Sequence, residues 1–241
     1  MDEIIQGFVL QTLRYGDSSL IVKIYTLNTG LQTYMVRGVN GKASKNRVAF
    51  FQPMTFLRFL QSGKPRQGRM AYLKDPETAY TFQSIPSVMN KSAILMYLSE
   101  LLSRTLTQQE RNESLYQFVF QSVVWLDLVE EGYANFPLFF TLELSRFLGF
   151  YPQTDYRPDS YFDMMEGQFV DRQPIHPYYL EKEHSGMLAK LLNRGIDEIT
   201  MVTMTGLQRN ELLDQIITFM RLHAPVMKGL QSHEVLKAVL R

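Results

Sequence analysis

Residues 19–39, "SLIVKIYTLNTGLQTYMVRGV", determine how the first half of the chain folds. The first ten of them alternate in polarity and are rich in β-branched side chains, which is typical of a half-buried strand. The turn residues "NTG" at 28–30 separate this run from a second strand-like run at 31–39. The sequence therefore predicts a β-hairpin here.

Three further strand-like runs surround this hairpin, at residues 4–14, 54–61 and 69–74, with glycine-rich turns nearby. Five short strands in one stretch of chain favour a small closed barrel, because closure leaves no exposed sheet edge. An open sheet packed on the second half of the chain is the alternative. Either arrangement makes residues 1–80 a β-domain.

The second half has a different hydrophobic period. Apolar residues recur there at helical spacing, and this pattern predicts six helices, at residues 87–106, 113–131, 136–150, 178–194, 205–224 and 232–240. A small hairpin is expected within residues 155–178, with Tyr161 to Met164 as one strand, Gln168 to Val170 as the other and Gly167 in the turn. The fold class is therefore α+β, with a helical domain at residues 81–241.

Charge is unevenly distributed along the chain, although the net charge is only +1. Residues 1–80 hold eleven Lys and Arg against five Asp and Glu, a net charge of +6, and the remainder carries −5. Between Asp17 and Asp75 there are ten basic residues and no acidic one. Scattered surface charge mixes signs over such a length, so this asymmetry indicates a polyanion-binding first domain.

Single-stranded nucleic acid is held in a barrel groove by cations along its backbone and by aromatic rings under its bases. The expected phosphate contacts are Arg37, Lys42, Lys45, Arg47, Arg58, Lys64, Arg66 and Arg69. Seven rings lie near these basic positions, at Tyr25, Tyr34, Phe50, Phe51, Phe56, Phe59 and Tyr72. Most of them are expected in the core. Phe50 and Phe51 are the stacking candidates, because adjacent residues of a strand point to opposite faces and only one of the two can face inward.

The order of these features resembles the bacterial recombination mediator family RecO. The resemblance rests on "GFVLQTLRYGDSSLIVKIYTLNTGLQTYMVRGVNGKASKN" at 7–46, "FFQPMTFLRF" at 50–59 and "LHAPVMKGLQSHEVL" at 222–236, and it spans the chain in order. It implies an OB barrel followed by a helical domain.

The resemblance also implies a function in DNA repair and recombination. Such a protein binds single- and double-stranded DNA and anneals complementary strands coated with single-strand-binding protein. With RecR, it helps load the RecA recombinase. Charge type alone nominates Arg104, Arg111 and Arg146 as contacts for the acidic tail of single-strand-binding protein.

One departure from the family pattern concerns metal. Many members carry four cysteines of a zinc module in the second domain, whereas this chain has no cysteine and has "TDYRPDSYFDMMEGQFVDRQPIHPYY" at that place. No zinc and no other cofactor are expected, and the small hairpin is expected to substitute structurally. The four histidines, His176, His184, His223 and His233, do not pair at the spacing of a helical metal site.

Catalytic motifs are also missing: there is no G-x-S-x-G, no H-E-x-x-H and no phosphate-binding loop, so an enzyme is not expected. The absence of cysteine, of a signal peptide and of a long apolar run fits a cytoplasmic, nucleoid-associated protein. Two rival functions share the same charge pattern. One is an RNA-binding OB protein, and the other is an adaptor whose barrel binds an acidic protein.

Overall fold

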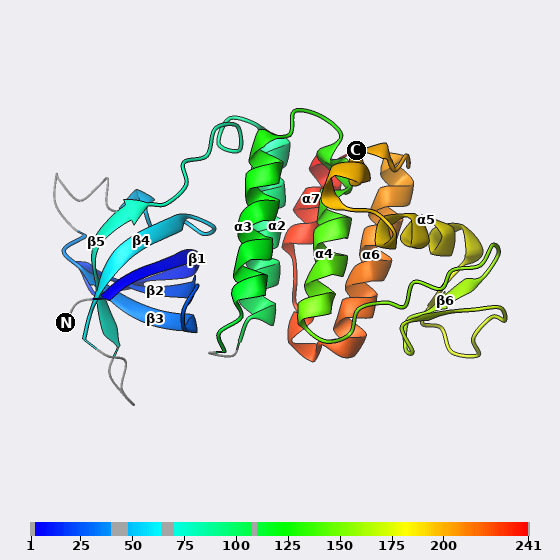
Figure 1. Ribbon diagram of the computed structural model, residues 1–241, viewed down its shortest axis with the longest axis horizontal. Coiled ribbons are helices and arrows are strands. Elements are labelled where there is room, and N and C mark those ends of the chain that lie inside the picture. The colour runs from blue at the N-terminus through cyan, green and yellow to red at the C-terminus, as the bar shows by residue number, and fades with distance from the viewer. Residues whose placement is uncertain (1–2, 40–47, 64–69, 108–109, 241) are drawn as a thin grey trace. The chain divides into compact units, whose positions relative to one another are not determined.

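The computed structural model describes residues 3–39, 48–63, 70–107 and 110–240 (Figure 1). Contacts divide the chain into two compact units, Met1–Gln83 with Leu98–Gln121, and Ser84–Tyr97 with Ser122–Arg241. Across the described ranges, no helix is long and apolar enough to cross a membrane.

The first unit contains a five-stranded barrel, which confirms the predicted closed arrangement over the open sheet. Its strands are β1 (Glu3–Tyr15), β2 (Ser19–Thr26), β3 (Gly30–Arg37), β4 (Phe56–Ser62) and β5 (Ala71–Thr78). They are ordered β1-β2-β3-β5-β4, and β4 pairs back onto β1. This is the five-stranded architecture expected of an OB barrel.

The long strand β1 closes the barrel by serving two neighbours. Its first part, from Glu3 to Phe8, pairs with β4, and its second part, from Gly7 to Tyr15, pairs with β2. The register with β2 shifts between Val9 and Gln11. Such an irregularity bends a strand, which lets one continuous segment belong to both sides of a barrel.

The barrel interior is filled by alternate residues of the strands, as the period of two requires. Its buried members include Ile5, Val9, Leu20, Val22, Ile24, Tyr34, Val36, Leu57, Phe59, Ala71 and Leu73. Gly30 opens β3 with φ of 69°, and a Cβ there would collide with the carbonyl of Glu110. Only glycine meets both demands at this position.

Within the first unit, part of the outer barrel surface is covered by the end of α2 (Met89–Thr105) and the start of α3 (Glu113–Leu128). Within the first unit, the ring of Phe8 lies 5.8 Å from that of Tyr116, and Phe56 lies 5.0 Å from Phe120 in an edge-on contact. Burial raises the pKa of Tyr116 to about 12. Outward-facing rings at this end of the barrel are therefore core residues.

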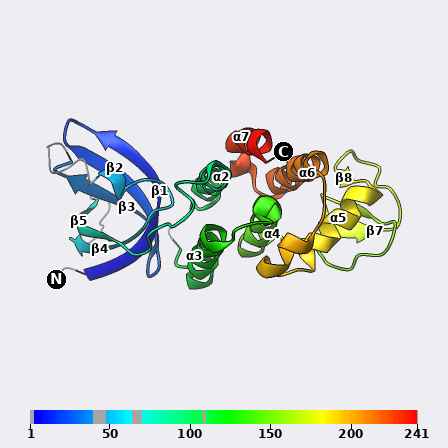
Figure 2. The same cartoon turned by 90° about the horizontal axis from the view of Figure 1, so that it is seen from above.

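The second unit is helical, and Figure 2 shows it from above. Its remaining helices are α4 (Phe136–Phe147), α5 (Lys182–Leu192), α6 (Gly206–His223) and α7 (Ser232–Val239), with short 3-10 helices η1 (Tyr133–Asn135), η2 (Ile196–Met201) and η3 (Pro225–Met227). Helix α6 packs against both α4 and α5. All six predicted helices are present, and Thr205 caps α6 by accepting a hydrogen bond from the Gln208 backbone N–H.

The predicted small hairpin is present and is extended by a third strand. Strands β6 (Tyr161–Asp163) and β7 (Gln168–Val170) are joined by a turn in which the Asp163 carboxylate accepts the backbone N–H groups of Met165 and Glu166. Strand β8 (Tyr179–Leu180) pairs with β6. The predicted start of a helix at residue 178 is therefore wrong. Tyr179 and Leu180 pair with the edge of β6 instead, and α5 begins after them.

A buried lysine stabilises the start of the second unit. The Lys91 ammonium donates to the carbonyls of Asp127, at 3.0 Å, and Val129, at 2.5 Å, and to the Ser84 hydroxyl. The Asp127 carboxylate in turn accepts the backbone N–H groups of Ser84 and Ile85. Burial lowers the pKa of Lys91. The end of α3 and the segment that precedes α2 are thus held by one polar network.

Candidate nucleic-acid interface

The part of the outer barrel surface that the helices leave exposed carries a row of apolar side chains. Leu13 of β1 is paired with Ile21 of β2, Ile21 with Met35 of β3, and Met35 with Tyr72 of β5. Leu13 is 49% exposed and the other three are partly exposed, whereas the residues on either side of Ile21, Met35 and Tyr72 in their strands are buried. We call these four residues the apolar stripe. The pairing register alone assembles it from four strands.

Cations lie on both sides of the apolar stripe. One neighbouring row contains Lys23 of β2, and the other contains Arg37 of β3, because each is two residues from a stripe member on the same strand face. Both side chains are exposed. The surface therefore offers apolar contact in the middle and positive charge at two edges, which is the combination that binds a single strand through its bases and phosphates.

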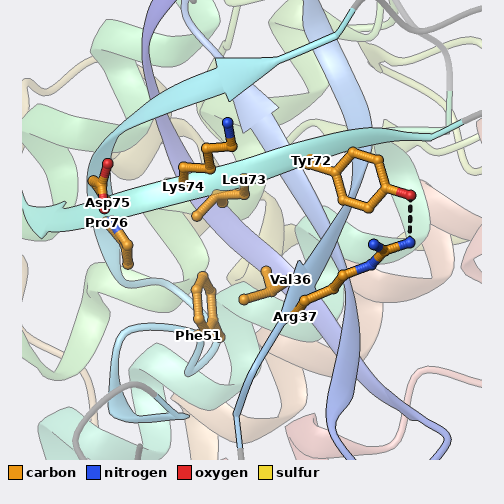
Figure 3. A pocket seen from close by; sticks show the side chains of 8 residues that line it. All are labelled: Val36, Arg37, Phe51, Tyr72, Leu73, Lys74, Asp75 and Pro76. Atoms are coloured by element: carbon orange, nitrogen blue, oxygen red, sulfur yellow. Dashed lines mark hydrogen bonds between the residues drawn. The ribbon is translucent and has the colours of Figure 1, made fainter.

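Arg37 is held in place by the stripe residue Tyr72. Its guanidinium carbon lies 4.5 Å from the centre of the Tyr72 ring, and one guanidinium nitrogen donates to the Tyr72 hydroxyl at 2.6 Å (Figure 3). The two residues are 35 positions apart, and the parallel pairing of β3 with β5 brings them together. A cation fixed in this way loses less side-chain freedom when it meets a phosphate.

Beside this pair lies a cavity of about 310 Å³ between β3 and β5. Figure 3 shows Val36, Phe51 and Leu73 pointing toward one another there, while the Lys74 ammonium points away from them. Pro76 and Asp75 complete the lining, and Asp75 has a positive φ of 48°. Among the described residues, the two strands share the register pairs Tyr34 with Ala71 and Met35 with Tyr72 and no others, so the sheet opens at Val36 and Leu73.

Two of the eight predicted phosphate contacts lie in the described residues, and both are exposed. Arg37 borders the apolar stripe. Arg58 is on β4, where it forms an ion pair of 2.7 Å with Glu77 of β5. The other six, Lys42, Lys45, Arg47, Lys64, Arg66 and Arg69, lie outside the described residues. The sequence prediction did not include Lys23, although the alternating pattern of residues 19–28 indicates that its side chain points outward.

The seven candidate aromatic rings fall into a buried group and a group with exposed surface. Five are buried, at Tyr25, Tyr34, Phe51, Phe56 and Phe59. Phe51 is 2% exposed, so its proposed stacking role is corrected to a place in the core. Phe50 and Tyr72 keep exposed surface. Phe50 and Phe51 lie in a turn rather than in a strand, yet they still differ in burial.

Known families match both halves of the chain. Residues 1–82 match the family described as "Recombination protein O N terminal", and residues 86–229 match "Recombination protein O C terminal". The chain belongs to the RecO family. RecO proteins are DNA repair proteins and non-enzymatic recombination mediators, so the prediction of a non-enzymatic function is confirmed.

Curated RecO relatives align over nearly their full length. "DNA repair protein RecO" of Phocaeicola vulgatus is 34% identical over 232 residues, which is 96% of each chain. The RecO protein of Flavobacterium psychrophilum is 33% identical, with 97% of each chain covered, and that of Porphyromonas gingivalis is 23% identical with the same coverage. The resemblance inferred from the three quoted motifs is therefore confirmed over nearly the whole chain.

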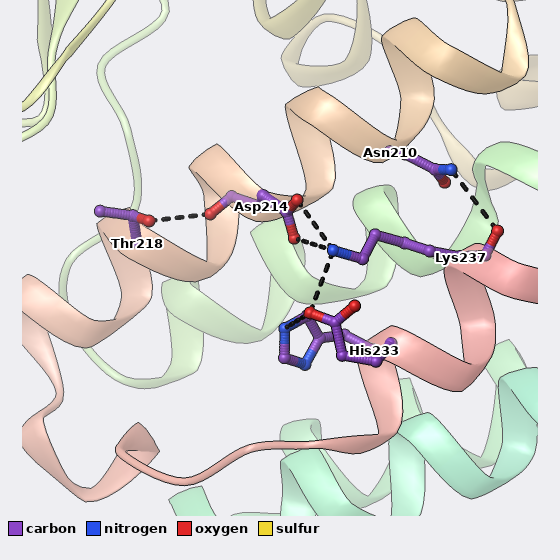
Figure 4. Close-up of polar contacts among 6 residues, drawn as sticks. Asn210, Asp214, Thr218, His233 and Lys237 are labelled. Atoms are coloured by element: carbon purple, nitrogen blue, oxygen red, sulfur yellow. Dashed lines mark hydrogen bonds and ion pairs between the residues drawn. The ribbon is translucent and has the colours of Figure 1, made fainter.

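In this RecO chain, one group of described residues has metal-ligating atoms close together, namely Asp214, His233 and Glu234. The Lys237 ammonium lies among them, 2.9 Å from both Asp214 carboxylate oxygens and 3.1 Å from Glu234 (Figure 4). An ammonium already supplies the positive charge that these carboxylates would offer to a metal. We interpret the group as an ion-pair network that joins α6 and α7.

The three arginines nominated for an acidic tail each have a carboxylate partner. Arg104 pairs with Glu100 at 2.8 Å, Arg111 with Glu113 at 2.9 Å and Arg146 with Glu143 at 3.2 Å. Arg146 also lies over the Tyr151 ring at 3.6 Å, and its hydrogen bond to Glu143 raises the pKa of its guanidinium. An acidic peptide would have to displace an internal carboxylate at each position.

Proposed function

We propose that this RecO family chain binds single- and double-stranded DNA on its barrel and anneals complementary strands. Together with RecR, it helps load RecA onto DNA coated by single-strand-binding protein. The observation that supports the DNA-binding step is the apolar stripe with Lys23 and Arg37 at its edges, on a domain with no acid between Asp17 and Asp75.

Annealing requires two polyanions to approach each other. Cations on the barrel neutralise phosphates and release counterions, so repulsion between the strands falls without any covalent step. The proposed phosphate contacts are Arg37, Lys42, Lys45, Arg47, Arg58, Lys64, Arg66 and Arg69. The proposal also includes a domain boundary at residues 80–81 and action in the cytoplasm at the nucleoid.

A strand-annealing assay tests this function directly. Complementary oligonucleotides are mixed with the protein, both bare and coated with single-strand-binding protein, and duplex formation is followed by fluorescence. We expect the protein to accelerate duplex formation in both cases. In a separate loading assay, we expect the protein together with RecR to increase the amount of RecA bound to coated DNA. Acceleration on bare strands alone would contradict the mediator role, and no acceleration at all would contradict the annealing role.

The basic residues Lys42, Lys45 and Arg47 are tested separately through salt dependence. Replacing Lys42, Lys45 and Arg47 together with Ala should flatten the slope of log K against log salt by up to roughly 0.7 for each lost contact on single strands. The control replaces Arg157, Arg172 and Lys190, which removes the same charge from exposed positions of the second unit. An unchanged slope in the triple variant would show that Lys42, Lys45 and Arg47 make no phosphate contact.

Competition separates the two rival functions. An RNA-binding barrel would prefer RNA to single-stranded DNA of the same sequence. An adaptor for an acidic protein would show no DNA binding even at low salt, where phosphate contacts are strongest. We expect DNA to compete at least as well as RNA.

A further inference from the structure

The cavity between β3 and β5 has the size and chemistry of a site for a small planar group. Its volume of about 310 Å³ is at the lower end of pockets that hold small molecules, roughly 300 to 1,000 Å³. It cannot hold a stacked run of bases. Its apolar wall consists of Val36, Phe51 and Leu73, which are 4%, 2% and 5% exposed and therefore belong to the rigid barrel core.

The mouth of the cavity differs from its wall. Arg37 and Tyr72 lie on one side as a bonded pair, and Lys74 is exposed on the outer face of β5. The cavity therefore has apolar walls, and its charged lining consists of two cations, Arg37 and Lys74, and one acid, Asp75. A neutral planar ring attached to a negatively charged backbone fits this distribution, because the ring leaves water while the charge stays at the opening.

We infer that this cavity receives one unstacked nucleobase of a DNA single strand, with Tyr72 and Arg37 at its entrance. The inference rests on the proposed function, because it assigns a subsite to the same barrel surface. The base is inserted against Val36, Phe51 and Leu73, and its 5′ or 3′ phosphate meets Arg37. The hydrogen bond from Arg37 to the Tyr72 hydroxyl holds the guanidinium beside the opening before DNA arrives.

This site would distinguish single strands from duplexes. A base in a single strand enters at little cost, whereas a paired base must first be unstacked and unpaired, which costs a few kcal/mol. Lys23 and the other exposed cations meet phosphates of either form. The cavity therefore adds affinity for single strands on top of a charge interaction that both forms share.

Abasic DNA tests the inference with the unmodified protein. A thymidine oligomer and an oligomer of the same length built entirely from abasic tetrahydrofuran units have the same phosphates but differ in their bases. We expect the thymidine oligomer to bind about tenfold or more tightly, since each stacked base contributes substantially to single-strand binding. Equal affinities for the two oligomers would overturn the inference.

Variants then locate the effect in the cavity. Tyr72→Leu removes the entrance ring and releases Arg37, while Tyr15→Leu removes a 55% exposed tyrosine of β1 that does not line the cavity. We expect Tyr72→Leu to reduce the preference for thymidine over abasic DNA by about fivefold, while its duplex affinity changes less than twofold. Tyr15→Leu should leave that preference unchanged.

The outcomes separate this inference from the proposed function. Retained duplex and single-strand binding with equal effects of the two tyrosine variants would overturn the base site and leave DNA binding intact. Failure of the unmodified protein to bind any DNA would overturn both. If Tyr72→Leu does not fold, as checked by circular dichroism, Val36→Phe takes its place, because it fills the cavity and leaves the apolar stripe unchanged. An unchanged preference for thymidine over abasic DNA in Val36→Phe would overturn the base site.

Discussion

The barrel and the helices differ in how they treat positive charge. In the helices, cations pair with carboxylates three or four residues away, as Arg104 does with Glu100, Arg146 with Glu143 and Lys237 with Glu234. Helical geometry places such residues on one face. The strand segment from residue 18 to 74 contains no acid at all, so no carboxylate within it can pair with Lys23 or Arg37. We infer that cations paired with a carboxylate stabilise the fold, whereas cations without an ion pair among the described residues, such as Lys23 and Arg37, are available to an external anion.

The largest effect on DNA affinity is expected when positive charge is reversed on the barrel, compared with the same change at arginines that are already paired. The double variant Lys23→Glu with Arg37→Glu should bind single-stranded DNA about 100-fold more weakly at low salt, a loss of about 2.7 kcal/mol, because two contacts become repulsions. The matched control is Arg111→Glu with Arg146→Glu, which changes the net charge equally at positions already paired. Fluorescence anisotropy measures both. Equal losses would mean that only net charge matters.

Removing the buried cation of the helical unit tests whether its charge is structural. Lys91→Met leaves the carbonyls of Asp127 and Val129 without their donor, and we expect a loss of about 3 kcal/mol in the free energy of unfolding. Urea denaturation followed by the fluorescence of Trp125, the only tryptophan, reports on this unit. Lys190→Met, at an exposed position of α5, serves as the control and should change stability by less than about 0.5 kcal/mol. A stable Lys91→Met variant would contradict the structural role.

Acidification should destabilise the helical unit through His233. Burial lowers the pKa of His233, and the nearby cations Lys237 and Arg221 lower it further, while the carboxylates of Glu234 and Asp214 oppose this. The unfolded chain then binds a proton near pH 6.5 that the folded chain does not, so stability falls as pH decreases below 6.5. We expect the free energy of unfolding to be lower at pH 5.5 than at pH 7.

The variant His233→Gln isolates this contribution, because it cannot take up the proton. Its urea midpoint, followed by Trp125 fluorescence, should fall less than that of the unmodified protein between pH 7 and pH 5.5. Identical pH dependence of the two proteins would show that His233 is not the group responsible.

The smallest expected effect concerns the one barrel cation seen with a cross-strand carboxylate partner among the described ion pairs. Glu77→Gln removes the partner of Arg58 and should raise single-strand affinity about two- to threefold, since a further cation becomes available to phosphate. Glu113→Gln, which releases Arg111 in the segment just before α3, is the control and should leave DNA affinity unchanged. A decrease with Glu77→Gln would indicate that Arg58 needs its partner to be positioned.

Local sequence patterns predicted most helices and strands. The predictions were wrong where contacts between residues far apart in the chain determine the conformation. The strands and six helices follow from periods of two and 3.6, which are properties of short segments. Residues 178–180 carry a helical pattern in sequence, but Leu180 pairs with Phe162 of β6, and this distant partner decides their conformation. The same limit applies to Phe50 and Phe51, whose neighbouring positions carry no signal of which ring enters the barrel.

By itself, the sequence determined that a basic β-domain precedes a helical one, because alternation and the absence of acids between Asp17 and Asp75 can be read from neighbouring residues. Only the tertiary structure decided which of those residues form a surface. Leu13, Ile21, Met35 and Tyr72 become one stripe through strand register, and Arg37 meets Tyr72 through the parallel pairing of β3 and β5. Register depends on contacts between segments far apart in the chain, and no local pattern encodes it.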